Sequence, residues 1–456
     1  MSAKDGPELL RNAPASGFAA DYDAGAESFA RFYAGHPRDA AAFERKAAEV
    51  DGRFDAAARA RVRDIVSPVN DEARRRLDAV AEGKGFVVTT GQQAGVLGGP
   101  LFTIYKALSA VALADALQER LGVPVLPVFW VASEDHDWAE IADLHLLDTS
   151  NQLHRFALED PAGDHAGGTG PSVARRRLDA RAHELIEQVR AVLPPTDFRD
   201  AMLERFRAAY APGVSPADAF EALLADLLAS APIATVQASN LELKRASIPI
   251  LRAELENGPR HEERLRTRTE QFEAAGYEAQ VPIQPGAENV FYEGEHGRER
   301  LVRAGDGWST RGRGLHLSRA QALAELEREP ARFSPNVLLR PIVESALLPT
   351  LAYVGGPAEV RYFAQTGCLF EAHGVGMPIV VARASFTVIE AKNRKVLDKF
   401  ELDLADLAVP EHELAGRLAA EEMPEEVAAA LKRVRGSIGE GYGALADAVK
   451  QIDPTL

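Results

Sequence analysis

The sequence has little cysteine and no long apolar run, and both absences narrow what the chain can be. Cys368 is the only cysteine among 456 residues, which excludes a disulfide framework and a paired-thiol metal site. We interpret Cys368 as a small core residue rather than a nucleophile. The amino terminus lacks the apolar stretch of a signal peptide, and no apolar run approaches membrane-spanning length. A cytoplasmic protein is therefore expected.

Positive charge is also scarce. Lysine and arginine together number 52 against 68 aspartates and glutamates, which gives a net charge of −16. Duplex nucleic acid and anionic membranes attract basic faces, so neither is an expected partner. The chain has no GxxxxGK[ST] loop, and its one cluster resembling GxGxxG, at 436–443, follows no strand. Neither NAD binding nor P-loop chemistry is supported.

What the sequence does contain is the alternation of strands and helices that is typical of an α/β protein. Short apolar strands are predicted at 85–90, 123–132, 232–238, 349–354 and 378–384, with helices after several of them. Strand, helix and strand within 85–132 form a βαβ unit and hence a parallel pair. Because proline removes a ladder donor, Pro124 and Pro127 are expected near a strand start or a sheet edge.

Three regions follow from this pattern. Residues 1–80 are predicted to be a helical segment packed on the core, and 81–385 a Rossmann-like core with insertions at about 150–230 and 277–335. Residues 386–456 are predicted to be helical and charged. Within them, apolar residues from 427 onward step mostly by three and four, a heptad-like stripe that needs a partner.

Polar residues follow several of the predicted strands. In an open parallel sheet the ligand lies outside the carboxyl ends of the strands, so these residues should converge on one cleft. They are Thr90, Gln92 and Gln93 after the first strand, Glu134, Asp135, His136 and Asp137 after the second, Asn240 after the third, and Gly355 and Gly356 after the fourth.

Two Gly-Gly-Pro loops precede helices. Gly98 and Gly99 would let an anion approach free backbone donors, and Pro100 suits the first helical position. The loop at 355–357 repeats this device, and Lys106 lies in the first turns of the helix after the first loop, where it could contact an anion. Plain turns without a ligand and a solvated lysine are equally consistent with the sequence.

The segment "EDHD" at 134–137 is the sharpest single signal. Its three carboxylates would repel one another unless they share a substrate ammonium, a metal ion or an arginine. His136 could be a general base whose tautomer Asp135 or Asp137 fixes; helix capping with an exposed His136 is the alternative. Glu140 and His145 lie nearby, but no HExxH or similar spacing appears, so no metal ligand is assigned.

One more segment is a candidate for contacts to a carboxylate or a phosphate. In "SPNVLLRP" the side chains of Asn336 and Arg340 could make such contacts, because a guanidinium can pair bidentately with an anion. A surface loop is an equally good interpretation of this segment.

Four long motifs resemble those of a known family. They are "TTGQQAGVLGGPLFTIYKALSA" (89–110), "PVFWVASEDHDWAEI" (127–141), "SPNVLLRPIVESALLPTLAYVGGPAEVRYFAQ" (334–365) and "GVGMPIVVARAS" (374–385). Together they resemble the bacillithiol biosynthesis cysteine-adding enzymes, and the likeness runs from "FAADYDAG" to "IDPTL".

The resemblance implies a Rossmann-like core similar to class I aminoacyl-tRNA synthetases, with a C-terminal coiled coil that supports a homodimer. It implies ligation of L-cysteine to the amine of glucosaminyl malate, which gives bacillithiol. ATP is the expected activator of the cysteine carboxyl, and Mg²⁺ is a possible companion. By position, Gln92, Gln93, Gly98, Gly99 and Pro100 match the nucleotidyltransferase signature loop, and Asn336 and Arg340 match its second nucleotide motif.

The chain also departs from that pattern. It has no His-x-Gly-His and no KMSKS-like loop, which weakens the ATP interpretation, and its coiled coil is expected to be shortened. Two alternatives therefore stay open: a nucleotidyl- or acyltransferase of the same fold that uses another amino acid and amine, and a non-catalytic dimeric binding protein.

Overall fold

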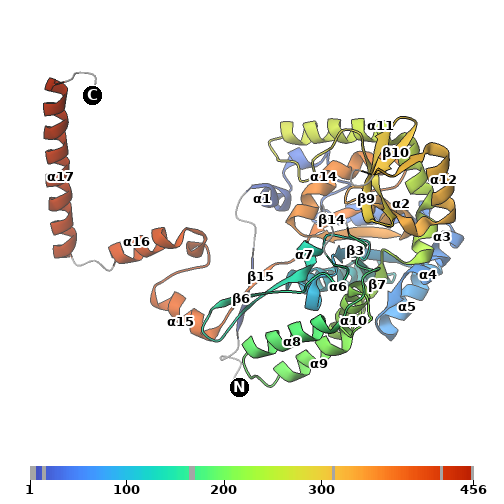
Figure 1. Ribbon diagram of the computed structural model, residues 1–456, viewed down its shortest axis with the longest axis horizontal. Helices are drawn as coiled ribbons and strands as arrows, with labels where there is room; N and C mark the ends of the chain where they lie inside the picture. The colour runs from blue at the N-terminus through green and yellow to red at the C-terminus, as the bar shows by residue number, and fades with distance from the viewer. Residues whose placement is uncertain (1–6, 13–16, 164–169, 311–313, 422–424, 453–456) are drawn as a thin grey trace. The chain divides into compact units, whose positions relative to one another are not determined.

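A computed structural model describes residues 7–12, 17–163, 170–310, 314–421 and 425–452 (Figure 1). The chain divides into two compact units, one formed by Ala13–Ser385 and the other by Met1–Asn12 with Phe386–Leu456. Over the described ranges, no helix is both long enough and apolar enough to cross a membrane.

A six-stranded sheet is the centre of the larger unit and confirms the expected Rossmann-like α/β class. Its neighbours are parallel except for the antiparallel pair at one edge, β2 with β7. In spatial order the strands are β14 (Ile379–Ala382), β13 (Thr350–Gly355), β3 (Phe86–Gln92), β4 (Val125–Val131), β7 (Ala234–Gln237) and β2 (Ser67–Pro68).

Side-chain alternation along these strands divides the core between the two faces of the sheet. Val87 of β3 packs in one hydrophobic cluster, while Phe86 and Val88 pack in another. Because both faces are covered, strands such as β4 are apolar throughout, as parallel sheets require. The helices of this unit are α1 (Gly17–Ala24), α2 (Ala40–Arg53), α3 (Ala56–Ala60), α4 (Val62–Ile65), α5 (Asp71–Ala81), α6 (Phe102–Leu121), α11 (Leu241–Ala274), α13 (Arg340–Leu347) and α14 (Pro357–Ala372), together with those of the insertions below.

The position of one proline differs from the prediction. Pro124 precedes β4 as expected, but Pro127 lies inside β4, opposite Val88 of the neighbouring central strand. The ladder on the other side of β4 begins only at Val128, which pairs with Ala234. Pro127 is therefore tolerated because its strand has a single ladder partner at that residue.

The first insertion contains a hairpin and helices, and it begins before the predicted boundary of about residue 150. Two elements precede that boundary, α7 (Trp138–Ala142) and β5 (Asp143–Leu147), and the others are β6 (Leu153–Ala157), α8 (Ala180–Val192), α9 (Arg199–Ala209) and α10 (Pro216–Leu227). The second region folds as a five-stranded antiparallel sheet that the weak sequence pattern did not reveal. Its order is β11 (His316–Ser318), β10 (Gly307–Thr310), β9 (Gly297–Ala304), β8 (Ala287–Gly294) and β12 (Phe333–Pro335), with α12 (Arg319–Arg328).

The smaller unit begins with a pair of strands that helical composition did not predict. Strand β1 (Glu8–Arg11) pairs antiparallel with β15 (Phe386–Ile389). The helices α15 (Ala391–Lys399), α16 (Glu411–Glu421) and α17 (Glu425–Ile452) follow. The end of the "IDPTL" motif, residues 453–456, lies outside the described residues.

Candidate functional site

The strand ends of the central sheet open on a cavity of about 730 Å³. This is the edge that the topology rule for parallel sheets selects, and the volume is typical of small-molecule sites. The predicted residues that line the cavity are Gln92, Gln93, Lys106, Glu134, Asp135, His136, Asp137, Asn336, Arg340 and Gly356.

Other predicted residues are not among those that line it. Thr90 is buried, and its hydroxyl donates to the Val354 carbonyl (2.8 Å), which ties β3 to β13. Asn240 caps α11 by accepting from the backbone N–H of Glu242 (2.9 Å). Gly355 is the last residue of β13. These residues support the site from outside it.

The loop with Gly98 and Gly99 is also away from the cavity lining. The Tyr210 hydroxyl accepts from the Gly98 amide (3.3 Å) and donates to the Gly95 carbonyl (3.1 Å). Gly98 and Gly99 have φ values of 92° and 69°, which favour glycine. Helix α6 begins at Phe102, so Pro100 is not its first residue. A braced turn, rather than an open anion cradle, accounts for the glycines.

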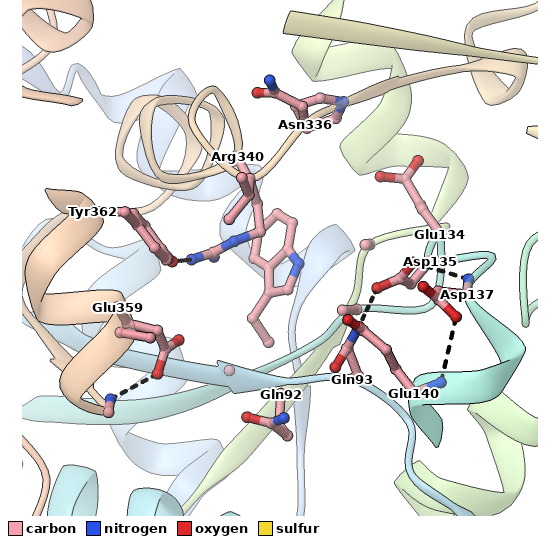
Figure 2. Close-up of a pocket in the computed structure, with 18 of the residues that line it drawn as sticks. Gln92, Gln93, Glu134, Asp135, Asp137, Glu140, Asn336, Arg340, Glu359 and Tyr362 are labelled. Atoms are coloured by element: carbon pink, nitrogen blue, oxygen red, sulfur yellow. Dashed lines mark hydrogen bonds between the residues drawn. The ribbon is translucent and has the colours of Figure 1, made fainter. Parts of the chain in front are cut away.

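One wall of the cavity is acidic. Figure 2 shows Glu134, Asp135, Asp137 and Glu140 on the same side as Gln93. The Asp135 carboxylate accepts from Gln93 Nε2 (2.7 Å) and from the backbone N–H of His136 (2.7 Å). Burial raises the pKa of Asp135, but Arg298 and these hydrogen bonds lower it below its ordinary value. Asp135 is therefore an ionised group.

Glu134 already has a cation. It forms a buried ion pair with Lys244 of α11, whose ammonium also donates to the Phe333 carbonyl. Burial raises the pKa of Glu134 and lowers that of Lys244, while the pairing opposes both shifts. The pair joins the end of β4 to α11, the bond to Phe333 extends the connection to the second insertion, and the charges of the pair balance each other.

The two other carboxylates of this wall are Asp137 and Glu140, and Glu140 accepts a hydrogen bond from Gln93 Nε2. Asp137 and Glu140 are exposed at the cavity, and in the described part of the chain neither forms an ion pair with lysine, arginine or histidine. Asp137 caps α7 by accepting from the Glu140 amide (3.3 Å), which fixes their spacing. Two carboxylates without a cation make this wall suitable for an ammonium group or a divalent ion.

His136 has an unexpected partner in Arg298 of β9. Arg298 is buried, and its Nη1 donates to His136 Nδ1 (3.1 Å), while its other nitrogens donate to Ser334 Oγ (2.8 Å) and the Pro335 carbonyl (3.1 Å). A guanidinium has no acceptor, so Nδ1 carries no proton and Nε2 carries it. Burial and Arg298 both lower the pKa of His136. This geometry disfavours the expected general-base role, because the acceptor nitrogen faces Arg298.

The opposite wall carries cations and tyrosines. Figure 2 shows Arg340, Tyr362 and Glu359 on this side. Arg340 pairs with Glu344 (2.7 Å) and donates to the hydroxyls of Tyr353 and Tyr362, each at 3.2 Å. Arg383, directly after β14, also lines the cavity. The geometry of the guanidinium groups suits carboxylate or phosphate oxygens.

Lys106 and Glu359 connect this wall to the start of α14. Lys106 is buried and pairs with Glu359 (2.5 Å), and it donates to the Gln92 side chain (3.0 Å). Burial lowers the pKa of Lys106, which Glu359 opposes. Glu359 also accepts from the Gly356 amide (2.7 Å), so an internal carboxylate fills the anion position at this helix terminus.

Sequence reasoning missed Arg298, Lys244, Arg383 and Tyr362. Arg383 could have been found, because it follows a predicted strand as the other candidates do. Arg298 lies in an insertion of weak pattern, and Lys244 reads as an ordinary helical lysine. Only the fold brings Arg298 and Lys244 to the EDHD segment.

The parallel sheet, its insertions and the strand-end cavity define a Rossmann-like α/β protein whose cavity has the size of a small-molecule site. The sequence matches the family described as "Bacillithiol biosynthesis BshC, N-terminal Rossmann-like domain" over residues 8–384, so the chain belongs to this family. The resemblance seen in the four motifs is thereby confirmed.

Individual relatives agree. The protein named "Putative cysteine ligase BshC" from Salinibacter ruber is 34% identical, and the match covers 85% of this chain and 70% of the relative. The protein of the same name from Symbiobacterium thermophilum is 33% identical, with 91% and 77% covered. That from Solibacter usitatus is 31% identical, with 94% and 78% covered.

Proposed function

We propose that this protein is a cysteine ligase that joins the carboxyl group of L-cysteine to the amine of glucosaminyl malate, forming bacillithiol. The observation that carries the proposal is a cavity with one acidic and one cationic wall, in the domain that the family match covers. Its relatives bear the name of a cysteine ligase, and an amide-forming site must hold both an amine and anionic groups.

The acidic wall fits the amine. An ammonium must lose a proton before its nitrogen can attack a carboxyl carbon, and a nearby carboxylate is a suitable acceptor. In the proposed reaction Asp137 and Glu140 orient the ammonium and one of them takes the proton. The C–N bond forms as the activating group leaves the cysteine carboxyl. His136 contributes a hydrogen bond from Nε2–H rather than proton abstraction.

The cationic wall fits anionic groups. Arg340, Arg383 and Lys106 would face the malate carboxylates or the phosphates of ATP, which is the proposed activating cosubstrate. Carboxylate oxygens of Asp137 and Glu140 are the ligand type that Mg²⁺ takes. Lys106 and Arg340 keep their pairs with Glu359 and Glu344, so Arg383 supplies the charge of this wall that such a ligand would balance, and a cavity of about 730 Å³ matches its size. ATP would supply a leaving group on the cysteine carboxyl.

Mass spectrometry of the reaction mixture tests the proposal. The protein is incubated with cysteine, glucosaminyl malate, ATP and Mg²⁺, and ATP is omitted from a second tube. Bacillithiol formed only with ATP is the expected result, and the accompanying AMP or ADP would distinguish an adenylate from an acyl phosphate.

Two substitutions of substrate complete the experiment. Serine replaces cysteine in one tube, and glucosamine replaces glucosaminyl malate in another. Equal turnover of serine would contradict specificity for cysteine. Equal turnover of glucosamine would show that the cationic wall does not bind the malate carboxylates. No product in any tube, from a protein that is folded, would contradict the ligase assignment.

A further inference from the structure

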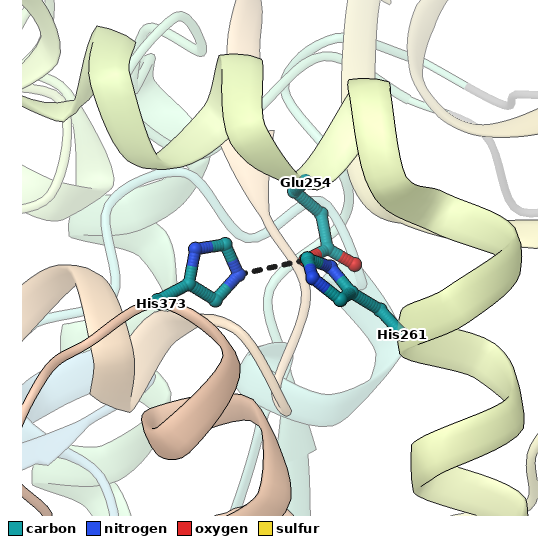
Figure 3. A group of neighbouring side chains, drawn as sticks. All are labelled: Glu254, His261 and His373. Atoms are coloured by element: carbon teal, nitrogen blue, oxygen red, sulfur yellow. Dashed lines mark hydrogen bonds and ion pairs between the residues drawn. The ribbon is translucent and has the colours of Figure 1, made fainter.

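A second cluster of polar side chains lies apart from the residues that line the cavity. It consists of Glu254 and His261 on α11 and His373 at the end of α14 (Figure 3). Glu254 Oε2 accepts from His261 Nδ1 (2.6 Å) and from His373 Nε2 (2.9 Å). Seven residues separate Glu254 from His261, which is two helical turns and places both on one face.

These three side chains are buried to a degree that is rare for their type. Their exposed fractions are 0% for Glu254, 7% for His261 and 1% for His373. Hydrogen bonds from both histidines outweigh burial and lower the pKa of Glu254 to about 2. The carboxylate is therefore ionised at neutral pH although it is fully buried, and two imidazoles donate to it.

The donor set is one that transition metals bind. One atom from each residue can be chosen so that all three lie within 4.8 Å of one another. Two imidazole nitrogens and a carboxylate oxygen are a common ligand set of Zn²⁺, with bonds of about 2.0–2.2 Å. An ion between these atoms requires only small side-chain movements, because their separations are already near those of a coordination sphere.

A further residue orients the carboxylate. Asn289 of β8 donates from Nδ2 to Glu254 Oε1 (2.7 Å), which leaves Oε2 directed at the histidines. Asn289 in turn accepts from Asn336 Nδ2 (2.8 Å), so Asn336 fixes the side chain that orients Glu254. Hydrogen bonds to the second oxygen of a ligating carboxylate are typical of metal sites.

We propose that Glu254, His261 and His373 bind a divalent transition-metal ion of the Zn²⁺ type, which fastens the end of α14 to α11. On binding, the ion takes the positions of the two protons that the imidazoles share with Glu254. In each neutral ring that proton moves to the other ring nitrogen. A cluster held by hydrogen bonds alone is the competing explanation, and the two differ in measurable ways.

The ion would also support the cavity. Asn336 lines the cavity and is the next member of the hydrogen-bonded series from Glu254 through Asn289. Its Oδ1 accepts from the Leu338 and Leu339 amides, directly before the helix that presents Arg340. A fixed Glu254 therefore steadies the segment that carries Arg340.

Metal binding to the intact, tag-free chain tests this proposal without any assay of activity. The protein is stripped with a chelator, titrated with Zn²⁺ and analysed for bound metal by mass spectrometry, and its Tm is measured with and without the ion. We expect one Zn²⁺ per chain that survives dialysis, a higher Tm, and visible d–d absorption when Co²⁺ replaces Zn²⁺.

Matched variants locate the ion. His261→Gln and His373→Gln should each weaken Zn²⁺ binding by at least about 100-fold, and Asn289→Ala by about 10- to 100-fold. His154→Gln is the control, because His154 pairs with a single carboxylate, Asp148, on the surface. Retained binding in both ligand variants would overturn the assignment. If the wild-type protein binds no Zn²⁺ and its Tm does not change, the proposal is wrong and hydrogen bonds alone hold the cluster. This result does not depend on whether the variants fold.

Discussion

At the scale of the residue, the partner of a side chain decides its chemistry more than its type does. His136 lies between two aspartates in the sequence, a pattern that favours a general base because a neighbouring carboxylate can fix the tautomer of the ring. In the fold its Nδ1 accepts a hydrogen bond from Arg298. The same histidine then becomes a neutral donor whose pKa is lowered from 6.5.

Substitution of His136 tests this role. His136→Asn keeps an acceptor near the position of Nδ1, so it should retain the hydrogen bond from Arg298 and lower kcat/KM by less than about tenfold. Loss of a general base would instead lower kcat/KM by at least about 10²-fold. His136→Ala, which leaves Arg298 without this acceptor, should be the more damaged variant. A loss of about 10²-fold or more in both would restore the general-base role.

The pH profile gives an independent measure. Because burial and Arg298 hold the pKa of His136 below its ordinary value, the ring stays neutral to a lower pH than an exposed imidazole does. The plot of kcat/KM against pH should show no inflection from this residue near 6.5, in the wild type or in His136→Asn. An inflection at 6.5 that disappears in the variant would show a titrating His136.

Asp137 and Glu140 should act on the amine substrate. Asp137→Asn and Glu140→Gln keep the size of each side chain and remove its charge, so each should raise KM for the amine substrate by about tenfold. Asp143→Asn, which removes a carboxylate paired with Arg155 on the surface, is the control. An unchanged KM in both cavity variants, with kcat measured in parallel, would exclude the proposed ammonium contact.

At the scale of the element, the first Gly-Gly-Pro loop shows how one sequence pattern serves two purposes. Gly99 has φ 69° and ψ −166°, a conformation that is open mainly to glycine. The Gly98 amide donates its hydrogen bond to the Tyr210 hydroxyl rather than to a ligand. The glycines in this loop satisfy backbone geometry, while Gly356 at the second loop reaches the cavity.

Replacement of Gly99 distinguishes the two purposes. Gly99→Ala should lower the free energy of unfolding by about 1–3 kcal/mol through backbone strain and leave KM within about twofold for the folded fraction. Gly122→Ala, at a helix end with φ 68°, is the control for positive φ away from the site. Denaturant titration measures both, and a KM more than tenfold higher in Gly99→Ala alone would return this loop to the ligand site.

At the scale of the whole molecule, α17 carries an apolar stripe that its own unit leaves exposed. The six residues that form it are 47–70% exposed: Val427, Leu431, Val434, Ile438, Tyr442 and Leu445. Their helical spacing is that of a coiled-coil seam. We propose that a second copy of the chain covers this stripe, which gives the homodimer that the family resemblance implies.

Sedimentation tests the proposed dimer. Leu431→Asp places a charge in the stripe and should shift the chain from dimer to monomer at micromolar concentration, because a buried charge opposes the seam. Ser437→Asp, on an exposed position outside the stripe, should leave the dimer unchanged. A monomeric wild type, or equal sedimentation of Leu431→Asp and wild type, would contradict this arrangement.

The sequence alone determined the class of the fold and much of the cavity. Apolar strands at regular intervals require a covered sheet, and parallel topology brings their carboxyl ends to one edge. Gln93, Asp135 and Arg340 could therefore be predicted as neighbours of a ligand from local pattern and a topological rule. The same reasoning also placed Gly99 in the site, but in the fold Gly99 serves backbone geometry and does not line the cavity.

Only the tertiary structure decided which partners these residues meet. Arg298 reaches His136 from a sheet whose sequence pattern was too weak to predict, and 119 residues separate Glu254 from His373. Protonation, charge balance and metal affinity depend on distances of a few ångströms between such segments, because electrostatic and coordination energies fall steeply with separation. Local sequence determines which groups are available, and only the packing of distant segments sets those distances.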